Sequence, residues 1–343
     1  MSLAVLFWSC VVIFGLVGLV ALQLIVVHLR AASRRRERQE LERQWLPVLV
    51  AALEERPATL PPLAGHQVTA LMALWNRLYD SIRDLSSAPL QEIAERTGMD
   101  AAARRMFASS TLHDRVLAIR TLGRLRDRSV WPALVRLASH RDLLLSLAAA
   151  RALVRIDPGE AIRLLLPIVA AREDWPATTV VLMLQEAGPD AVSQPLVDAI
   201  PQVPPGQVHR LIRFLGLAHA DVAGPLLKLL VRQVTTVESI SACLRVFNDS
   251  DDLGAVRPFL YHPRWEVRVR AVDVIGRLGT AKDAPRLIAM LSDSEWWVRY
   301  RAAQALCALS SNDLGRVKRV QATHGDPFAR DMLTHVLAEQ GAA

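Results

Sequence analysis

The chain has 343 residues, of which 52% are hydrophobic and 22% are charged, and its formal net charge is +7. This length allows one large domain or two ordinary ones. Six arginines and three glutamates lie between Arg30 and Arg43, so almost half of the net charge belongs to one short segment, and the rest does not call for a nucleic-acid partner.

The first predicted element is a membrane-spanning helix within residues 1–29. The segment from Leu3 to Val27 contains no charged side chain. As a helix it would be about 37 Å long, which exceeds the roughly 30 Å hydrocarbon core of a bilayer. A cleaved signal peptide is the alternative, but it would need a positively charged start and an apolar core of about 7–15 residues. The segment therefore predicts an anchor.

A basic patch follows the predicted span and sets its expected orientation. Its arginines are Arg30, Arg34, Arg35, Arg36 and Arg38. Positive residues beside a span stay in the cytoplasm. We therefore expect a single-pass protein of the bacterial inner membrane, with its N-terminus outside and the rest of the chain in the cytoplasm. Anionic lipid headgroups are the expected partner of the patch.

Two helical segments are predicted before the main domain. Residues 30–66 should form a basic juxtamembrane helix and a proline-rich connector, and residues 67–111 a helical cap. Trp45 lies on the apolar side of the juxtamembrane helix, where it packs against protein or in the membrane interface. A cap is expected because the end of a stack of repeats needs an atypical outer face.

The remaining residues, 112–343, contain a repeat. The pattern A-x-x-x-L-G-x-L, or a degenerate form of it, begins at Ala118, Ala149, Val180, Leu211, Ala242, Ala271, Ala302 and Leu333. Successive copies are 31 residues apart, except for one step of 29. A near-constant phase over eight copies predicts a repeat architecture with a period of about 31 residues.

Each copy has the pattern of a helical hairpin. Apolar residues recur at helical spacing, a short turn follows, and proline then marks the first turn of a second helix in three copies, at Pro132, Pro225 and Pro285. One hairpin cannot bury its own apolar face, so hairpins must stack. The sequence therefore predicts an all-α fold, an α-solenoid of stacked helical hairpins preceded by one transmembrane helix.

The segment Asp283–Leu309 resembles a HEAT repeat of the short bacterial kind, the type also found in phycobilisome lyases. The matching residues are Pro285, Leu287, Leu291, Asp293, Val298, Arg299, Ala302, Ala305 and Leu306. The resemblance implies that Asp293 caps the next helix and that Arg299 links neighbouring repeats. The middle copies lack the Val-Arg pair, so there the match depends on phase alone.

No motif in the chain indicates catalysis. HExxH, GxxxxGK[ST], GxSxG and GxGxxG are absent, and no two histidines have the spacing of metal ligands on one helix face. Asp249, Asp251 and Asp252 could suggest a metal, but aspartates in a turn are usually solvated. Cys10, Cys243 and Cys307 form no CxxC motif and are expected to be small apolar residues. We therefore predict no catalytic residue, no cofactor and no metal.

The best candidates for partner binding are three tryptophans and two arginines. Trp265, Trp296 and Trp297 lie where first helices begin, and either staple those helix starts or form an aromatic ridge for a partner. Arg257 and Arg286 share one place near the start of second helices. Second helices are expected to line the concave side, where a charged face either is solvated or contacts a partner.

These features favour a non-enzymatic scaffold. We expect a membrane-anchored adaptor whose solenoid binds a protein partner, itself membrane-associated, such as a component of a cell-envelope or polysaccharide synthesis or secretion system. A nucleic-acid-binding solenoid is the first alternative. It is disfavoured because, among equivalent second-helix positions, only Arg257 and Arg286 are basic. A bilin-lyase-like enzyme is the second alternative, and it depends on analogy of fold.

Overall fold

The computed structural model describes residues 22–23, 25–26, 28, 35–54, 56, 59–81, 88–109, 111–310 and 314–341. Most of the predicted span, together with Arg30, Arg34 and Cys10, lies outside these ranges. Among the residues described, no helix has both the length and the apolar character needed to cross a membrane. Every regular element in the described ranges is an α-helix or a short 3-10 helix, which confirms the all-α prediction.

Two compact units divide the chain, one ending at Val130 and the other beginning at Trp131. In the first unit, residues 35–53 are helical. The remaining elements of this unit are η1 (Gly65–Gln67), α2 (Val68–Ser81), α3 (Ala88–Arg96), α4 (Met99–Phe107), α5 (Leu112–Arg124) and η2 (Arg128–Val130). Trp45 and Trp75 are almost completely buried in its core. Trp45 therefore packs against protein, which settles the alternative that the sequence left open.

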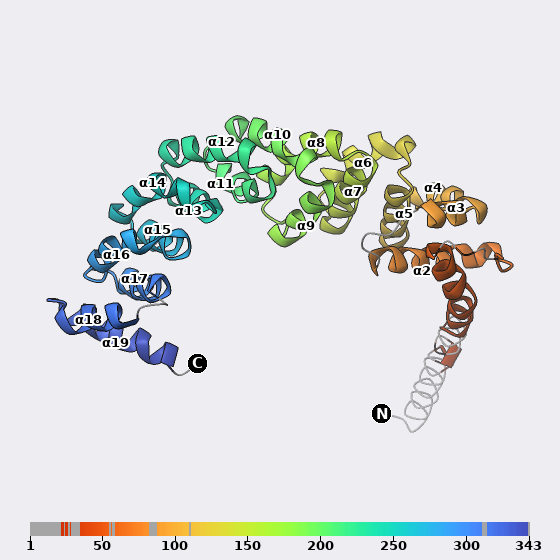
Figure 1. The fold of residues 1–343 in the computed structure, drawn as a ribbon. Helices are drawn as coiled ribbons and strands as arrows, with labels where there is room; N and C mark the ends of the chain where they lie inside the picture. Colours follow the sequence, from red (N-terminus) through yellow and green to blue (C-terminus); the bar gives the residue numbers. More distant parts are fainter. Residues whose placement is uncertain are drawn as a thin grey trace, which may run out of the picture. The chain divides into compact units, whose positions relative to one another are not determined.

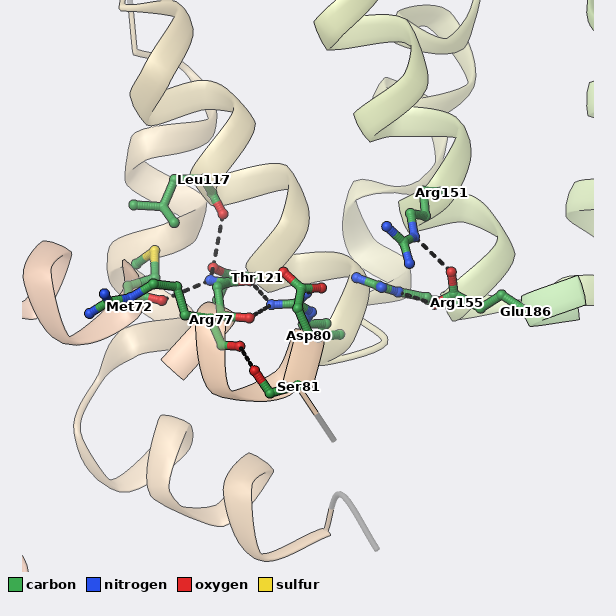
Figure 2. A network of polar contacts seen from close by, with 11 residues as sticks. Met72, Arg77, Asp80, Ser81, Leu117, Thr121, Arg151, Arg155 and Glu186 are labelled. Carbon is green, nitrogen blue, oxygen red and sulfur yellow. Dashed lines mark hydrogen bonds and ion pairs between the residues drawn. The ribbon is translucent and has the colours of Figure 1, made fainter. Parts of the chain in front are cut away.

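A buried polar network joins α2 to α5 within the first unit. Asn76 Nδ2 donates to the Thr121 hydroxyl at 2.7 Å, and that hydroxyl donates to the carbonyl of Leu117 at 2.9 Å. Arg124 Nη1 donates to the carbonyl of Asn76 at 2.6 Å, and Nη2 pairs with the carboxylate of Asp80. Figure 2 shows Thr121 between Leu117 and the α2 side of this network.

The second unit is a stack of helical hairpins. Its helices are α6 (Trp131–Ala138), α7 (Leu143–Ile156), α8 (Pro158–Ala171), α9 (Ala177–Ala187), α10 (Pro189–Ala199), α11 (Val208–Ile212), α12 (Ala220–Gln233), α13 (Val237–Val246), α14 (Leu253–Val256), α15 (Trp265–Leu278), α16 (Ala284–Met290), α17 (Trp296–Leu309), α18 (Leu314–Thr323) and α19 (Pro327–Gly341). Short 3-10 turns are η3 (Ile200–Gln202), η4 (Leu215–Leu217), η5 (Ser250–Asp252), η6 (Arg257–Tyr261) and η7 (Ala281–Asp283).

The predicted phase agrees with the buried core. All eight reference residues, from Ala118 to Leu333, are at most 6% exposed. Side-chain caps fix several helix starts: Asp142 Oδ1 accepts from the amide of Leu145 at the start of α7, and Asp157 Oδ1 accepts from the amide of Glu160 at the start of α8, both at 3.0 Å. The periodic apolar face of each first helix therefore packs against its neighbours in the stack.

Two expectations about second helices are wrong. Within the second unit the first helices α7, α9, α11, α13, α15 and α17 form the inner layer of the arc, and α8, α10, α12, α14 and α16 form the outer layer (Figure 1). Pro225 lies inside α12 rather than in its first turn. That helix begins earlier, at Ala220, and the amide of His219 just before it donates to the Ser193 hydroxyl of the preceding repeat at 2.8 Å.

Polar bonds between repeats join the stack. Arg268 on α15 pairs with Asp293 in the turn before α17, with donor–acceptor distances of 2.6 and 2.8 Å. Arg277 Nη2 donates to the carbonyl of Phe247 in the preceding repeat at 2.6 Å. In the same unit, Arg151 and Arg155 of α7 both bind Glu186 at the end of α9 (Figure 2). These bonds set how one hairpin lies on the next.

Candidate partner-binding surface

Arg257 and Arg286 converge on one buried carboxylate. Arg257 Nε and Nη2 donate to the two oxygens of Asp283 at 2.8 and 3.2 Å, and Arg286 Nη1 lies 3.5 Å from one of them. The amide of Thr280 also donates to Asp283 at 3.3 Å. Asp283 is completely buried. Arg286 lies on the outer-layer helix α16, and Arg257 begins η6, directly after the outer-layer helix α14. The two arginines therefore meet at the carboxylate of Asp283, and not beside the exposed Trp296 and Trp297.

The pKa of Asp283 follows from this environment. Burial acts to raise it, but the hydrogen bonds from Arg257 and from the backbone of Thr280, with the charges of both arginines, lower the pKa below its usual range. Asp283 is therefore ionised at neutral pH and joins two neighbouring hairpins.

Trp296 and Trp297 lie together in the open, at the start of α17. Their side chains are 44% and 52% exposed. Their ring centroids are 4.8 Å apart in an edge-to-face arrangement, and Tyr300 stacks on Trp296 at 5.1 Å. We call Trp296, Trp297 and Tyr300 the aromatic cluster. Rings that are held by one another lose little conformational freedom on binding, so the cluster is a candidate for partner binding.

Helix α19 contacts the aromatic cluster through Tyr300. The Tyr300 hydroxyl donates to Glu339 on α19 at 3.0 Å, and this hydrogen bond is the main cause that raises the pKa of Tyr300. His335, also on α19, has its ring 6.2 Å from that of Tyr300. Phe328 at the start of α19 is 67% exposed, with the guanidinium of Arg299 5.9 Å from its ring. Exposed aromatic side chains therefore occupy the equivalent positions Trp297 and Phe328 of two consecutive repeats.

Trp175 has the same place in its repeat as Trp297, and it has a structural role. It is buried, and its Nε1 donates to the Ser146 hydroxyl at 3.1 Å. The guanidinium of Arg172 lies 5.6 Å from its ring. The staple interpretation therefore describes Trp175, whereas Trp296 and Trp297 keep much of their surface in solvent.

Trp265 lies one repeat before the aromatic cluster, in the position equivalent to Trp296. It is half-buried and lines a cavity of about 380 Å³ formed by α11, α13 and α15. Three arginines share this cavity: Arg213, Arg245 and Arg270. Sequence analysis missed them because it examined basic residues only on second helices. The equivalence of Arg270 and Arg301, each one residue before its repeat's reference alanine, could have pointed to Arg270, whereas Arg213 and Arg245 occupy other repeat positions and gave no such signal.

Of the two residues linked to the HEAT resemblance, Asp293 stabilises the turn before a helix, and Arg299 contacts both that turn and the next repeat. Asp293 accepts from the amide of Glu295 at 2.9 Å and so stabilises the turn before α17, whose N-cap Glu295 has no side-chain cap bond. Arg299 donates to the carbonyls of Asp293 and Ser294 in its own turn, at 2.7 and 3.0 Å. Arg299 also reaches the next repeat, because its guanidinium lies 5.9 Å from the ring of Phe328, and Arg268, its equivalent one copy earlier, forms an ion pair with Asp293.

The described residues contain no evident metal site and no evident reactive thiol. Within them, no three His, Cys, Asp or Glu side chains are grouped so that they could hold a metal ion. Of the three aspartates in the turn, Asp249 accepts from the amide of Asp251, and Asp252 pairs with Lys228. Cys243 and Cys307 are buried, and burial raises the pKa of Cys243 to about 12. A thiol with that pKa stays protonated at neutral pH.

These observations define a helical-repeat protein of the α-solenoid class. A family model described as HEAT repeats matches residues 105–185 and 238–340, which is more than half of the chain. The chain therefore belongs to the HEAT-repeat family. The unmatched residues between these ranges include the shortened helix α11. No curated protein matches the chain in sequence.

Proposed function

We propose that this protein is a non-enzymatic scaffold that binds a protein partner through the aromatic cluster. The observation that supports this most directly is the pair Trp296 and Trp297, 44% and 52% exposed and in contact with each other. Tryptophan and tyrosine are the residues that most often dominate the binding energy of protein interfaces.

The proposal includes an anchor in the bacterial inner membrane. It is supported by the uncharged segment from Leu3 to Val27 and by the basic patch after it, whose members Arg35, Arg36 and Arg38 are exposed. The solenoid would then lie in the cytoplasm, close to anionic headgroups. A membrane-associated component of cell-envelope or polysaccharide synthesis or secretion is the partner that this placement suggests.

The phycobilisome-lyase resemblance adds a repeat type but no activity. A lyase would need a group that holds or attacks its substrate, and the buried thiols of Cys243 and Cys307 do not provide one. Nucleic-acid binding is the second candidate, and the observation that favours it is the trio of arginines beside Trp265.

The test is affinity purification of the full chain from native membranes in mild detergent, with and without nuclease. The wild-type chain is compared with Trp296→Ala/Trp297→Ala and with Leu182→Ala, a control that removes an exposed apolar side chain from α9. The co-purified protein is then titrated directly against each purified chain.

We expect a stoichiometric protein that survives nuclease and binds the control normally. The double variant should bind it at least about 30-fold more weakly, since an interface hot spot contributes about 2 kcal/mol or more. Equal binding by the double variant would exclude the aromatic cluster as the binding surface. Recovery of nucleic acid alone, lost on nuclease treatment, would contradict the scaffold proposal itself.

A further inference from the structure

A basic groove lies on the inner-layer helices, next to the repeat that carries the aromatic cluster. Its cavity of about 380 Å³ is within the usual range of roughly 300–1,000 Å³ for ligand sites. The groove is lined by His209 and Arg213 at α11, Glu238 and Arg245 on α13, and Trp265 and Arg270 on α15. We call this set the arginine groove. His209 and Arg213 also line a second cavity of about 230 Å³, so the hollow continues toward α9.

Two of its arginines have no anionic partner. Arg270 pairs with Asp273 at 3.3 Å, and Glu266 on the same rim pairs with Arg264 at 2.9 Å. For Arg213 and Arg245, by contrast, no carboxylate of the described chain lies within ion-pair distance. Guanidinium groups at a cavity wall usually have anionic or carbonyl partners. These two are available to a ligand.

The electrostatic environment supports the same conclusion. Burial lowers the pKa of Arg245, and the charges of Arg270 and Arg213 lower it further. Burial also lowers the pKa of His209, with added contributions from Arg213 and Arg210, while Glu238 opposes them. Like charges held together in a partly desolvated site repel one another, and a bound anion would relieve that repulsion.

The carboxylates of the rim decide which anion fits. A nucleic-acid strand carries a charge at every step of about 3.4 Å, so it could not avoid Glu238 and Glu266 on the same wall. A peptide can place carboxylates opposite the arginines and uncharged residues elsewhere. Trp265 and Val269 line the groove too and provide an apolar contact.

We propose that the arginine groove binds an acidic segment of the protein partner, with carboxylates on Arg213 and Arg245 and an apolar side chain against Trp265. This inference rests on the proposed scaffold function. The groove and the aromatic cluster occupy the same positions on two adjoining helices, α15 and α17. The equivalent pairs are Trp265 and Trp296, Val269 and Tyr300, and Arg270 and Arg301. One extended partner segment can therefore contact both.

The probe is a fluorescein-labelled 12-residue peptide with four aspartate or glutamate residues, two leucines and otherwise serine and glycine, titrated against the full chain in detergent at low salt. A matched peptide carries asparagine and glutamine instead, and a single-stranded DNA 12-mer is the third ligand. The variants are Arg213→Gln/Arg245→Gln and, as a control with the same loss of charge, Arg136→Gln/Arg163→Gln on the outer helices α6 and α8. Anisotropy reports binding.

We expect the acidic peptide to bind at least about 10-fold more tightly than the amide peptide, and its affinity to fall as salt rises. Arg213→Gln/Arg245→Gln should weaken binding by at least about 10-fold, the control by less than about 2-fold. Removal of two like charges should leave the melting temperature of the groove variant unchanged or raised, so loss of binding would not reflect unfolding.

Three results would overturn the inference: no binding of the acidic peptide, equal binding of the amide peptide, or an unchanged affinity in the groove variant. DNA that binds more tightly than the peptide and depends on Arg213 and Arg245 would assign the groove to nucleic acid instead. This titration needs no native partner, and the partner test depends on Trp296 and Trp297. The two proposals can therefore fail separately.

Discussion

Arg124 occupies a position in the first unit where a charged side chain costs free energy unless its neighbours compensate. It is 4% exposed, donates to the carbonyl of Asn76 and pairs with Asp80, and its guanidinium lies 5.2 Å from the ring of Tyr79. Such a residue is costly to bury, but it is costlier to remove from partners that remain buried. Arg124 thus joins α2 to α5.

Replacement of Arg124 by methionine should destabilise the first unit by about 3 kcal/mol, because Asn76 and Asp80 lose their donor. Urea unfolding followed by tryptophan fluorescence and circular dichroism would measure the change. Arg120→Met, an exposed position on the same helix, should stay within about 0.5 kcal/mol of wild type. A similar small loss in Arg124→Met would show that the network contributes little.

Asp283 gives a prediction that depends on pH. Its pKa is lowered in the folded chain, so its contribution to stability is complete above its unfolded value of about 3.9 and disappears as pH falls through the folded value. Asp283→Asn should therefore lose about 2 kcal/mol at pH 7, and the difference from wild type should shrink below about pH 4.

Thermal unfolding across that pH range measures the effect. Arg286→Ala is the matched control, since Arg286 is 44% exposed and 3.5 Å from the carboxylate, and it should cost less than about 1 kcal/mol. A stability difference for Asp283→Asn that stays constant from pH 7 to pH 3 would contradict the assigned role of the ionised carboxylate.

At the scale of the element, helices α15 and α17 are in close contact at a glycine. A Cβ placed on Gly276 would lie 2.6 Å from the Cβ of Ala305 and 3.1 Å from its Cα. The atoms in the way include backbone, so the helices would have to separate. This contact sets the spacing between the repeat with Trp265 and the repeat with Trp296.

Gly276→Ala should therefore destabilise the second unit by about 1–3 kcal/mol, despite the higher helix propensity of alanine. Gly224→Ala in α12 meets nothing within 4 Å and should stabilise by about 0.5–1 kcal/mol. Chemical denaturation of both variants tests the contrast in sign. Stabilisation in both would mean that the two helices can move apart at no cost.

The sequence predicted the elements of this fold better than their arrangement. The repeat phase identified the buried residue of every first helix, because burial follows directly from apolar periodicity. It could not identify the inner layer, because the direction of curvature depends on how closely the two layers pack. Nor did the sequence show that Trp175 is buried whereas Trp297, at the same place in its repeat, is exposed. The residue 29 positions earlier is Ser146 in one case and Arg268 in the other, and only the serine accepts from the indole.

At the scale of the whole second unit, each hairpin packs mainly on its neighbours, so stability should be local. Removal of α18 and α19 would expose the buried side of α17 and remove Glu339 from Tyr300. Hydrogen exchange read by mass spectrometry should show lost protection in α15 and α17, with α7 and α8 unchanged. Loss of protection throughout the unit would mean that it unfolds as one cooperative body.

The short helix α11 gives the stack a mechanical property. It has 5 residues, the fewest of any inner-layer helix, whereas α7, α15 and α17 have 14 each, and the 3-10 turn Leu215–Leu217 follows it closely. The outer-layer helix α14 has 4 residues, but η5 and η6 adjoin it and extend it from Ser250 to Tyr261. Fewer contacts hold adjacent repeats together where a helix is short. We therefore expect tension applied to the two ends of the solenoid to deform it first at α11. Because His209 and Arg213 lie at that point, the width of the arginine groove would change with load. Stretching single molecules with and without the acidic peptide would show this as a shift in the first extension step.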